Sequence, residues 1–168
     1  MTVKYFTNEF NDELLLKAEL SPRLRHHHNL HNSHSDPVQR LAIGIKYGSY
    51  IPPHYHNLSS QWEFFHIIKG CILLMIFSHT GVVEDIIEIG EESNIYAMEI
   101  PPMTCHTRIC KSPEAIIYEW KQGPFDSKNA KLIPYWAPSE SYEQHTREFI
   151  IQHLLSLSIG EQLNLFIK

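Results

Sequence analysis

The segment GSYIPPHYHNLSSQWEFFHIIKG, residues 48–70, joins a double proline, a His-x-His pair and a glutamate that opens an apolar run. The double proline excludes a helix and a central position in a β-ladder, so the chain is extended through His54 and His56. Residues two apart on an extended chain point to the same side. Glu63 follows after a connection short enough to fold back, and antiparallel pairing would place it opposite the two histidines. The segment therefore predicts neighbouring extended segments with three converging metal ligands.

Further strand-length apolar runs, separated by tight turns, lie on both sides of this segment. Short strands at intervals of about 8–12 residues favour a sandwich or barrel. No periodic segment of helical length interrupts residues 38–121, which argues against parallel βαβ units. The predicted strands cover residues 38–45, 62–70, 71–78, 82–89, 95–100, 106–110 and 115–121. The fold class expected is all-β.

Two helices are predicted outside this region. The first covers about residues 8–20, is capped by Thr7 or Asn8 and ends before Pro22. The second begins near Ser139 or Ser141 and extends to about residue 157, with apolar residues at helical spacing. It packs on the barrel wall or contributes a dimer contact.

We accordingly expect three segments along the chain. Residues 1–35 form an N-terminal helix and a His-rich stretch that packs on the barrel, 36–126 form the barrel, and 127–168 form a C-terminal extension with a helix. The polar stretch 23–36 has no clear periodicity.

The bulk composition excludes several classes of protein. The 168 residues suggest one domain, and 43% hydrophobic with 20% charged residues is ordinary for a globular protein. With 14 basic and 19 acidic residues the net charge is -5, which leaves no excess of positive charge for nucleic acid. No apolar run approaches the roughly 20 residues that span a bilayer, and no signal-peptide pattern begins the chain. A cytoplasmic location is expected, and the three cysteines are read as small buried residues rather than as a disulfide framework.

His106, in the stretch IPPMTCHT (100–107), completes a candidate metal site with His54, His56 and Glu63. It starts a later strand that closure of a barrel would bring alongside the first three. Three imidazoles and one carboxylate suit one divalent transition metal, namely Fe, Mn, Zn, Ni or Co. The alternative is that the His-x-His pair merely decorates a surface strand.

These residues resemble the two cupin motifs. Gly48, His54, His56, Glu63 and Gly70 fit G-x5-H-x-H-x(3,4)-E-x6-G, except that six residues separate His56 from Glu63. In the second motif, G-x5-P-x-G-x2-H-x3-N, Pro101 and His106 fit, whereas Ile95, Met103 and Cys110 replace the two glycines and the asparagine. The resemblance implies a jelly-roll (double-stranded β-helix) barrel with the four-residue metal site inside it.

The chain is also similar to the WbuC family of cupin-fold metalloproteins, which occur among O-antigen and lipopolysaccharide biosynthesis genes. The similarity covers about residues 6–126, includes the longer His-to-Glu spacing, and leaves out the C-terminal helix. It is carried by SPRLRHHHNLH (21–31), DPVQRLAIGIKYGSYIPPHYH (36–56), QWEFF (61–65) and YEWKQGPFD (118–126).

Several polar residues around the predicted site are candidates for substrate binding. Asn29 and His31 match an N-x-H element of the WbuC family, and they either bind substrate at the barrel mouth or lie in a solvated loop. Gln39 shares a strand face with Leu41 and Ile43, and Tyr50 shares strand parity with His54, so both are expected to line a pocket.

Glu119 and Lys121 share a strand face with Ile117. An inward Glu119 near a metal is the candidate general base and Lys121 a candidate substrate ligand, whereas the alternative is an ordinary surface Glu/Lys pair.

Three functions remain open. In the first, the protein is a metal-dependent enzyme of surface-polysaccharide biosynthesis that isomerises or epimerises a sugar or nucleotide-sugar, with metal stabilising an enediolate and Glu119 or a histidine moving the proton. The second is an Fe(II)-dependent dioxygenase, and the third is a non-catalytic, metal-dependent sugar-binding module. The gene context of the WbuC family implies a small, carbohydrate-derived ligand, and a homodimer is expected by analogy with other cupins.

Overall fold

The computed structural model describes residues 3–126 and 131–165. Eight strands form two antiparallel sheets, with one helix before them and one after them. The five-stranded sheet has the order β1-β2-β8-β3-β6, and the three-stranded sheet has the order β5-β4-β7. The bounds of the elements are α1 Asn8–Glu19, β1 Arg25–Asn29, β2 Val38–Lys46, β3 Glu63–Lys69, β4 Cys71–Phe77, β5 Val83–Gly90, β6 Ala97–Ile100, β7 Cys105–Cys110, β8 Glu114–Gln122 and α2 Gln144–Ser156.

The main core lies between the two sheets, because each sheet turns its apolar face toward the other. Ile72 and Leu74 of β4 meet Ile45, Phe65 and Ile117 of the five-stranded sheet in one buried cluster. Burial of apolar surface of this kind is the dominant favourable contribution to folding. The all-β architecture with flanking helices, expected from the strand spacing, is confirmed.

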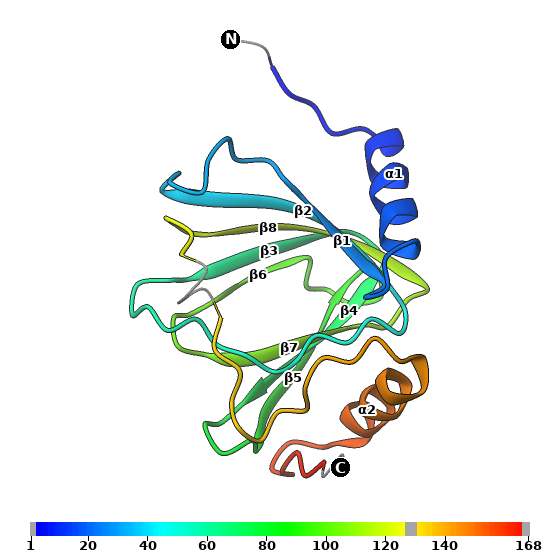
Figure 1. Cartoon of the computed structure of the whole chain (residues 1–168), viewed down its shortest axis with the longest axis vertical. Helices are drawn as coiled ribbons and strands as arrows, with labels where there is room; N and C mark the ends of the chain where they lie inside the picture. The colour runs from blue at the N-terminus through cyan, green and yellow to red at the C-terminus, as the bar shows by residue number, and fades with distance from the viewer. Residues whose placement is uncertain (1–2, 127–130, 166–168) are drawn as a thin grey trace.

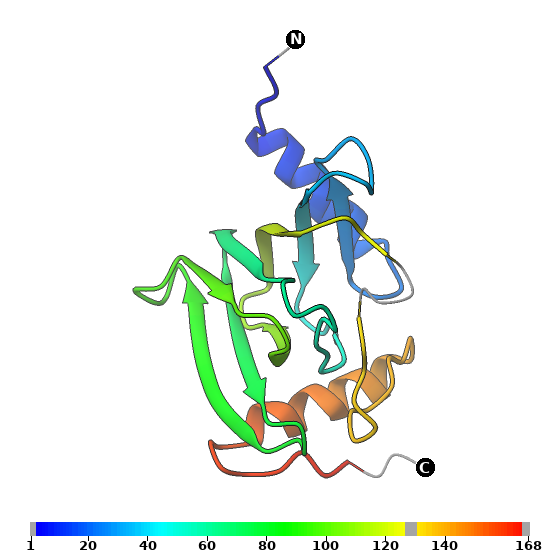
Figure 2. The same ribbon diagram turned by 90° about the vertical axis from the view of Figure 1, so that its left-hand side faces the viewer.

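Helix α2 covers the outer face of the three-stranded sheet. Along β4, the residues that alternate with the core positions point outward, and Met75 packs against Ile150, Ile151 and Leu154 of α2. Figures 1 and 2 show α1 and α2 at opposite ends of the molecule, with the sheets between them. The prediction that the second helix packs on the barrel wall is confirmed, although it begins at Gln144 rather than near residue 139 or 141.

Helix α1 packs on the outer face of the five-stranded sheet. Its N-cap Thr7 accepts a hydrogen bond from the backbone N–H of Phe10, and Leu14 and Leu15 pack on Ala42 and Ile116. The observed start at Asn8 agrees with the sequence-based prediction.

Gly44 allows the close approach of α1 to β2. A Cβ atom added at this position would lie 2.8 Å from the carbonyl oxygen of Leu14. We expect Gly44→Ala to destabilise the protein by about 1–3 kcal/mol, because the helix must move away from the sheet. Urea unfolding would measure the loss, and a variant as stable as the parent would contradict the close packing.

The histidine-rich stretch contains a strand that the sequence did not predict. Residues Arg25–Asn29 form β1, which pairs antiparallel with β2 at one edge of the sheet. The sequence RHHHN carries no apolar alternation, so its pairing depends on the backbone of β2 rather than on its own side chains. The division of the chain at residues 35 and 126 stays a prediction, but β1 already belongs to the five-stranded sheet.

Candidate metal centre and adjoining pocket

The four predicted metal ligands lie together inside the barrel. One potential ligand atom from each of His54, His56, Glu63 and His106 lies within 4.8 Å of all the others, and all four side chains are buried. His54 and His106 pair backbone to backbone across an isolated bridge, with N–O distances of 3.0 and 2.9 Å. This bridge brings segment 49–56 against β7, while Glu63 enters from the start of β3.

Backbone carbonyls orient two of the rings. Nδ1 of His54 lies 2.9 Å from the oxygen of Pro52, and Nδ1 of His106 lies 3.0 Å from the oxygen of Thr104. A carbonyl oxygen can only accept, so each Nδ1 carries the proton and each Nε2 offers its lone pair. Metal-binding histidines commonly donate their other ring N–H to a carbonyl or carboxylate in this way, which fixes the orientation of the ring.

The cluster has the polar atoms that a bound cation would satisfy. Nε2 of His106 lies 3.1 Å from Oε2 of Glu63, yet neither atom makes a hydrogen bond within the described parts of the chain. Both residues are at most 2% exposed, and buried polar atoms without partners are costly. Three imidazole nitrogens and a carboxylate suit a divalent transition metal, so these residues fit such an ion.

The charges around the cluster favour the protonation states that ligands need. Burial, joined by the positive charge of Lys131, holds the pKa of His54 well below its usual value. Burial alone would raise the pKa of Glu63, but the His106 and His56 rings and the charges of Arg108 and Lys121 outweigh it and hold that pKa well below its usual value. The structure therefore favours a neutral His54 and an ionised Glu63.

The lowered pKa of His54 predicts how stability depends on pH. Above about pH 6.5 the histidine is neutral in both the folded and the unfolded chain. Below that pH only the unfolded chain binds the proton, so the free energy of unfolding of metal-free protein should fall by up to about 1.4 kcal/mol per pH unit. Urea titrations between pH 7 and 5 would measure this slope, and His54→Asn should flatten it. The exposed His79 provides the matched variant His79→Asn, and equal slopes for the two variants would contradict the assignment.

A pocket of about 370 Å³ lies beside the cluster, on the inner face of the five-stranded sheet. The strand register places Gln39 and Lys121 of the pocket beside Glu63 of the cluster, on β2, β8 and β3. Leu41 and Glu119, which also line the pocket, are neighbours two residues away along β2 and β8. The lining comprises Arg23, Arg25, His26, His27, Asn29, His31, His34, Gln39, Leu41, Ile43, Ile45, Ile51, Arg108, Ile117, Glu119, Lys121, Phe125 and Lys131.

Ion pairs connect the pocket to the cluster. Glu119 accepts from Nη1 of Arg108 at 2.8 Å and lies 3.1 Å from Nζ of Lys121, which is itself 3.9 Å from Oε1 of Glu63. Arg108 also lies 5.2 Å from the ring centroid of Phe65. Of the sequence-predicted residues, Glu119 and Lys121 thus lie between the pocket and the cluster.

Of the other four residues predicted to bind substrate, three line the pocket and one does not. Asn29 and His31 line the pocket, and so does Gln39, although its amide nitrogen already donates to the backbone oxygens of residues 33, 34 and 36. Tyr50 is not among the lining residues. It is 1% exposed, packs in the α2 cluster and donates its hydroxyl hydrogen to the oxygen of Pro138 at 2.7 Å.

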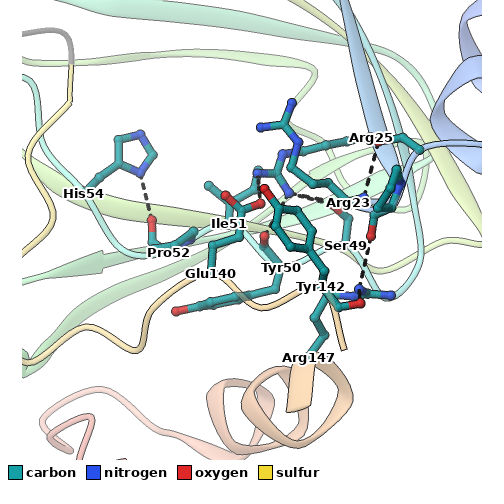
Figure 3. A network of polar contacts seen from close by, with 12 residues as sticks. Arg23, Arg25, Ser49, Tyr50, Ile51, Pro52, His54, Glu140, Tyr142 and Arg147 are labelled. Carbon is teal, nitrogen blue, oxygen red and sulfur yellow. Dashed lines mark hydrogen bonds and ion pairs between the residues drawn. The ribbon is translucent and has the colours of Figure 1, made fainter. Parts of the chain in front are cut away.

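The sequence-based reasoning missed Arg23, Arg25, Arg108 and Lys131. Arg108 had a signal, since it lies two residues after His106 and therefore shares its inward face. No local sequence pattern indicated Arg25, because its position depends on contacts with residues distant in sequence. It donates to the oxygen of Tyr50 and forms an ion pair with Glu140 (Figure 3).

Two facing antiparallel sheets with a buried three-histidine, one-glutamate cluster between them give this protein a cupin-type fold with a site able to bind a metal. The chain belongs to the family described as domain of unknown function DUF6016, whose model matches residues 6–89. No curated protein matches the sequence.

Solved structures share the fold. A Shewanella oneidensis protein of 7% identity superposes with a TM-score of 0.52, over 64% of this chain and 72% of its own. A recombinant oxalate oxidase in complex with glycolate has 14% identity and a TM-score of 0.51, over 67% and 56% of the two chains. The DMSP lyase DddQ from Ruegeria pomeroyi has 16% identity and a TM-score of 0.50, over 66% and 52%. At these identities the likeness concerns the fold alone. Within the described residues, neither helix is long and apolar enough to cross a bilayer.

Proposed function

We propose that the protein is a metal-dependent cupin enzyme that isomerises or epimerises a sugar or nucleotide-sugar. The observation that carries this proposal is the ion-pair connection from the polar pocket through Glu119 and Lys121 to Glu63 of the candidate metal cluster. A substrate filling the pocket would thus meet a carboxylate on one side and the cluster on the other. A role in O-antigen or lipopolysaccharide biosynthesis is supported by the resemblance to the WbuC family.

Each part of the site has a task in this chemistry. His54, His56, Glu63 and His106 would hold a divalent metal, which would supply Lewis-acid polarisation of a substrate oxygen when bound. In an isomerisation, Glu119 removes the proton from the carbon next to a substrate carbonyl and delivers it to the former carbonyl carbon, while the proton of the neighbouring hydroxyl moves to the former carbonyl oxygen. Arg108 and Lys121 position the carboxylate of Glu119 through ion pairs at 2.8 and 3.1 Å, one at each carboxylate oxygen.

Isotope exchange tests this function. Protein purified with its native metal, identified by elemental analysis, is incubated in D₂O with a panel of nucleotide-sugars and sugar phosphates. We expect deuterium to enter the substrate at the carbon that is deprotonated. Glu119→Gln should slow the exchange by at least about 100-fold while the metal content stays unchanged. The control is Glu114→Gln on the same strand, because Glu114 pairs with surface Lys46 and Lys69 instead.

Three outcomes would overturn the proposal. Fe(II)-dependent oxygen uptake without deuterium exchange would identify a dioxygenase. Metal-dependent binding of sugars without any conversion would identify a binding module. Full exchange activity in Glu119→Gln would remove Glu119 from the reaction.

We also propose a cytoplasmic homodimer, which the sequence led us to expect. Light scattering on the purified chain would measure its mass against the 19.6 kDa of the monomer.

A further inference from the structure

The pocket carries more positive charge than its own acids neutralise. Its lining includes five cationic side chains and a single carboxylate, Glu119. Arg108 and Lys121 share that carboxylate, and Arg25 pairs with Glu140. Within residues 3–126 and 131–165, no carboxylate lies within ion-pair distance of the two remaining cations, Arg23 and Lys131.

The cations are also close enough to influence one another. Burial of its amine, followed by the positive charges of Arg108 and Arg25, lowers the pKa of Lys131, although the residue as a whole is exposed to solvent. Like charges gathered in one pocket repel each other, and an anion placed between them would relieve that repulsion.

His31 adds a buried hydrogen-bond donor to the same pocket. Its Nδ1 lies 3.0 Å from both the backbone nitrogen and the oxygen of Arg40, and that oxygen already accepts from the backbone N–H of Leu30 at 2.8 Å. The N–H of Arg40 needs an acceptor, so Nδ1 accepts and the ring proton is on Nε2. The residue is 9% exposed, and within the described residues its Nε2 has no hydrogen-bond partner. A buried N–H without an acceptor is costly, and a ligand oxygen would satisfy it.

The geometry points to an anion-binding pocket: Arg23, Lys131 and Nε2–H of His31, at different places along its lining, bind the phosphate or carboxylate groups of a molecule that also reaches the metal cluster. This inference rests on the proposed function for the part of the molecule that reaches the cluster, and it narrows the substrate to an anionic sugar derivative. Arg25 of β1 also lines the pocket. Its hydrogen bond to Tyr50 and its ion pair with Glu140 hold it beside segment 49–54, which ends at the candidate metal ligand His54 (Figure 3).

Calorimetric binding of small probes to the full chain tests this anion-binding pocket. The probes are glucose 1-phosphate, glucuronate and neutral glucose, so that the phosphate and carboxylate arms are separated. We expect at least one anionic probe to bind ten-fold or more tightly than glucose, with affinity that falls as salt is raised. The double variant Arg23→Gln/Lys131→Gln should lose at least ten-fold for that probe. The control double variant Arg40→Gln/Lys111→Gln removes the same charge outside the pocket and should bind like the parent.

A second variant isolates the contribution of His31. In His31→Asn the side-chain oxygen can still accept from the N–H of Arg40, but the donor at Nε2 is gone. This variant should fold like the parent and bind the anionic probe several-fold more weakly.

The anion-binding pocket is overturned if both anionic probes bind no better than glucose, or if the Arg23/Lys131 double variant binds them like the parent. Because these probes need no turnover, failure here leaves the isotope-exchange result untouched. Conversely, tight anion binding without deuterium exchange would refute the proposed reaction and leave the anion-binding pocket standing.

Discussion

Glu63→Gln is expected to weaken binding of Co²⁺ or Zn²⁺ by more than about 100-fold. Loss of an outer-shell partner of a metal ligand already costs about 10–100-fold in affinity. Glu63 is a candidate ligand itself, and its carboxylate provides the only negative charge in a cluster of three histidines. Glutamine keeps the shape of the side chain and removes that charge, so the fold should persist.

Competition against a chelator measures this affinity, and the visible spectrum of bound Co²⁺ reports on the ligand set. The control is Glu99→Gln, an exposed position on β6, which should bind metal like the parent. Thermal unfolding of both metal-free variants checks that they are folded. Parent-like Co²⁺ affinity in a folded Glu63→Gln protein would remove Glu63 from the site.

Arg108→Met is expected to destabilise the metal-free protein by about 3–5 kcal/mol. Arg108 and Glu119 form a buried ion pair at 2.8 Å, with side chains 8% and 2% exposed. Removing Arg108 leaves the carboxylate of Glu119 buried without its closest opposite charge. This costs far more free energy than losing an ion pair at the surface. Lys121 still contacts Glu119 at 3.1 Å, but only at the other carboxylate oxygen.

Urea unfolding measures this loss, and a double-mutant cycle assigns its cause. Adding Glu119→Gln to Arg108→Met should recover much of the stability, because the buried negative charge is then gone. Arg40→Met is the matched surface variant: its pair with Asp36 is 3.8 Å long and its side chain is 43% exposed, so the loss should stay below about 1 kcal/mol. Equal losses for Arg108→Met and Arg40→Met would contradict a buried pair that positions Glu119.

The strands of the core were predictable because their apolar alternation is local. Gln39, Leu41, Ile43 and Ile45 alternate along β2, and all four line one face in the structure. Strand β1 was missed for the opposite reason, since its polar sequence becomes a strand only when β2 offers its edge. Tyr50 shows the same difference between local and long-range information. Its position on the same strand side as His54 predicted that it lines the pocket, but its hydroxyl group donates to the oxygen of Pro138, 88 residues further along the chain.

By itself, the sequence determined the type of every element except β1, and the side of its strand on which each candidate ligand lies, because both follow from backbone periods of two and 3.6 residues. It therefore pointed to His54, His56, Glu63 and His106 as one set. Only the tertiary structure decided which faces meet. The registers of β2, β8 and β3 place Lys121 between Gln39 and Glu63, and the packing of the chain after β8 brings Glu140 to Arg25. Such contacts depend on strand register and chain closure over long separations, and no local pattern of residues encodes them.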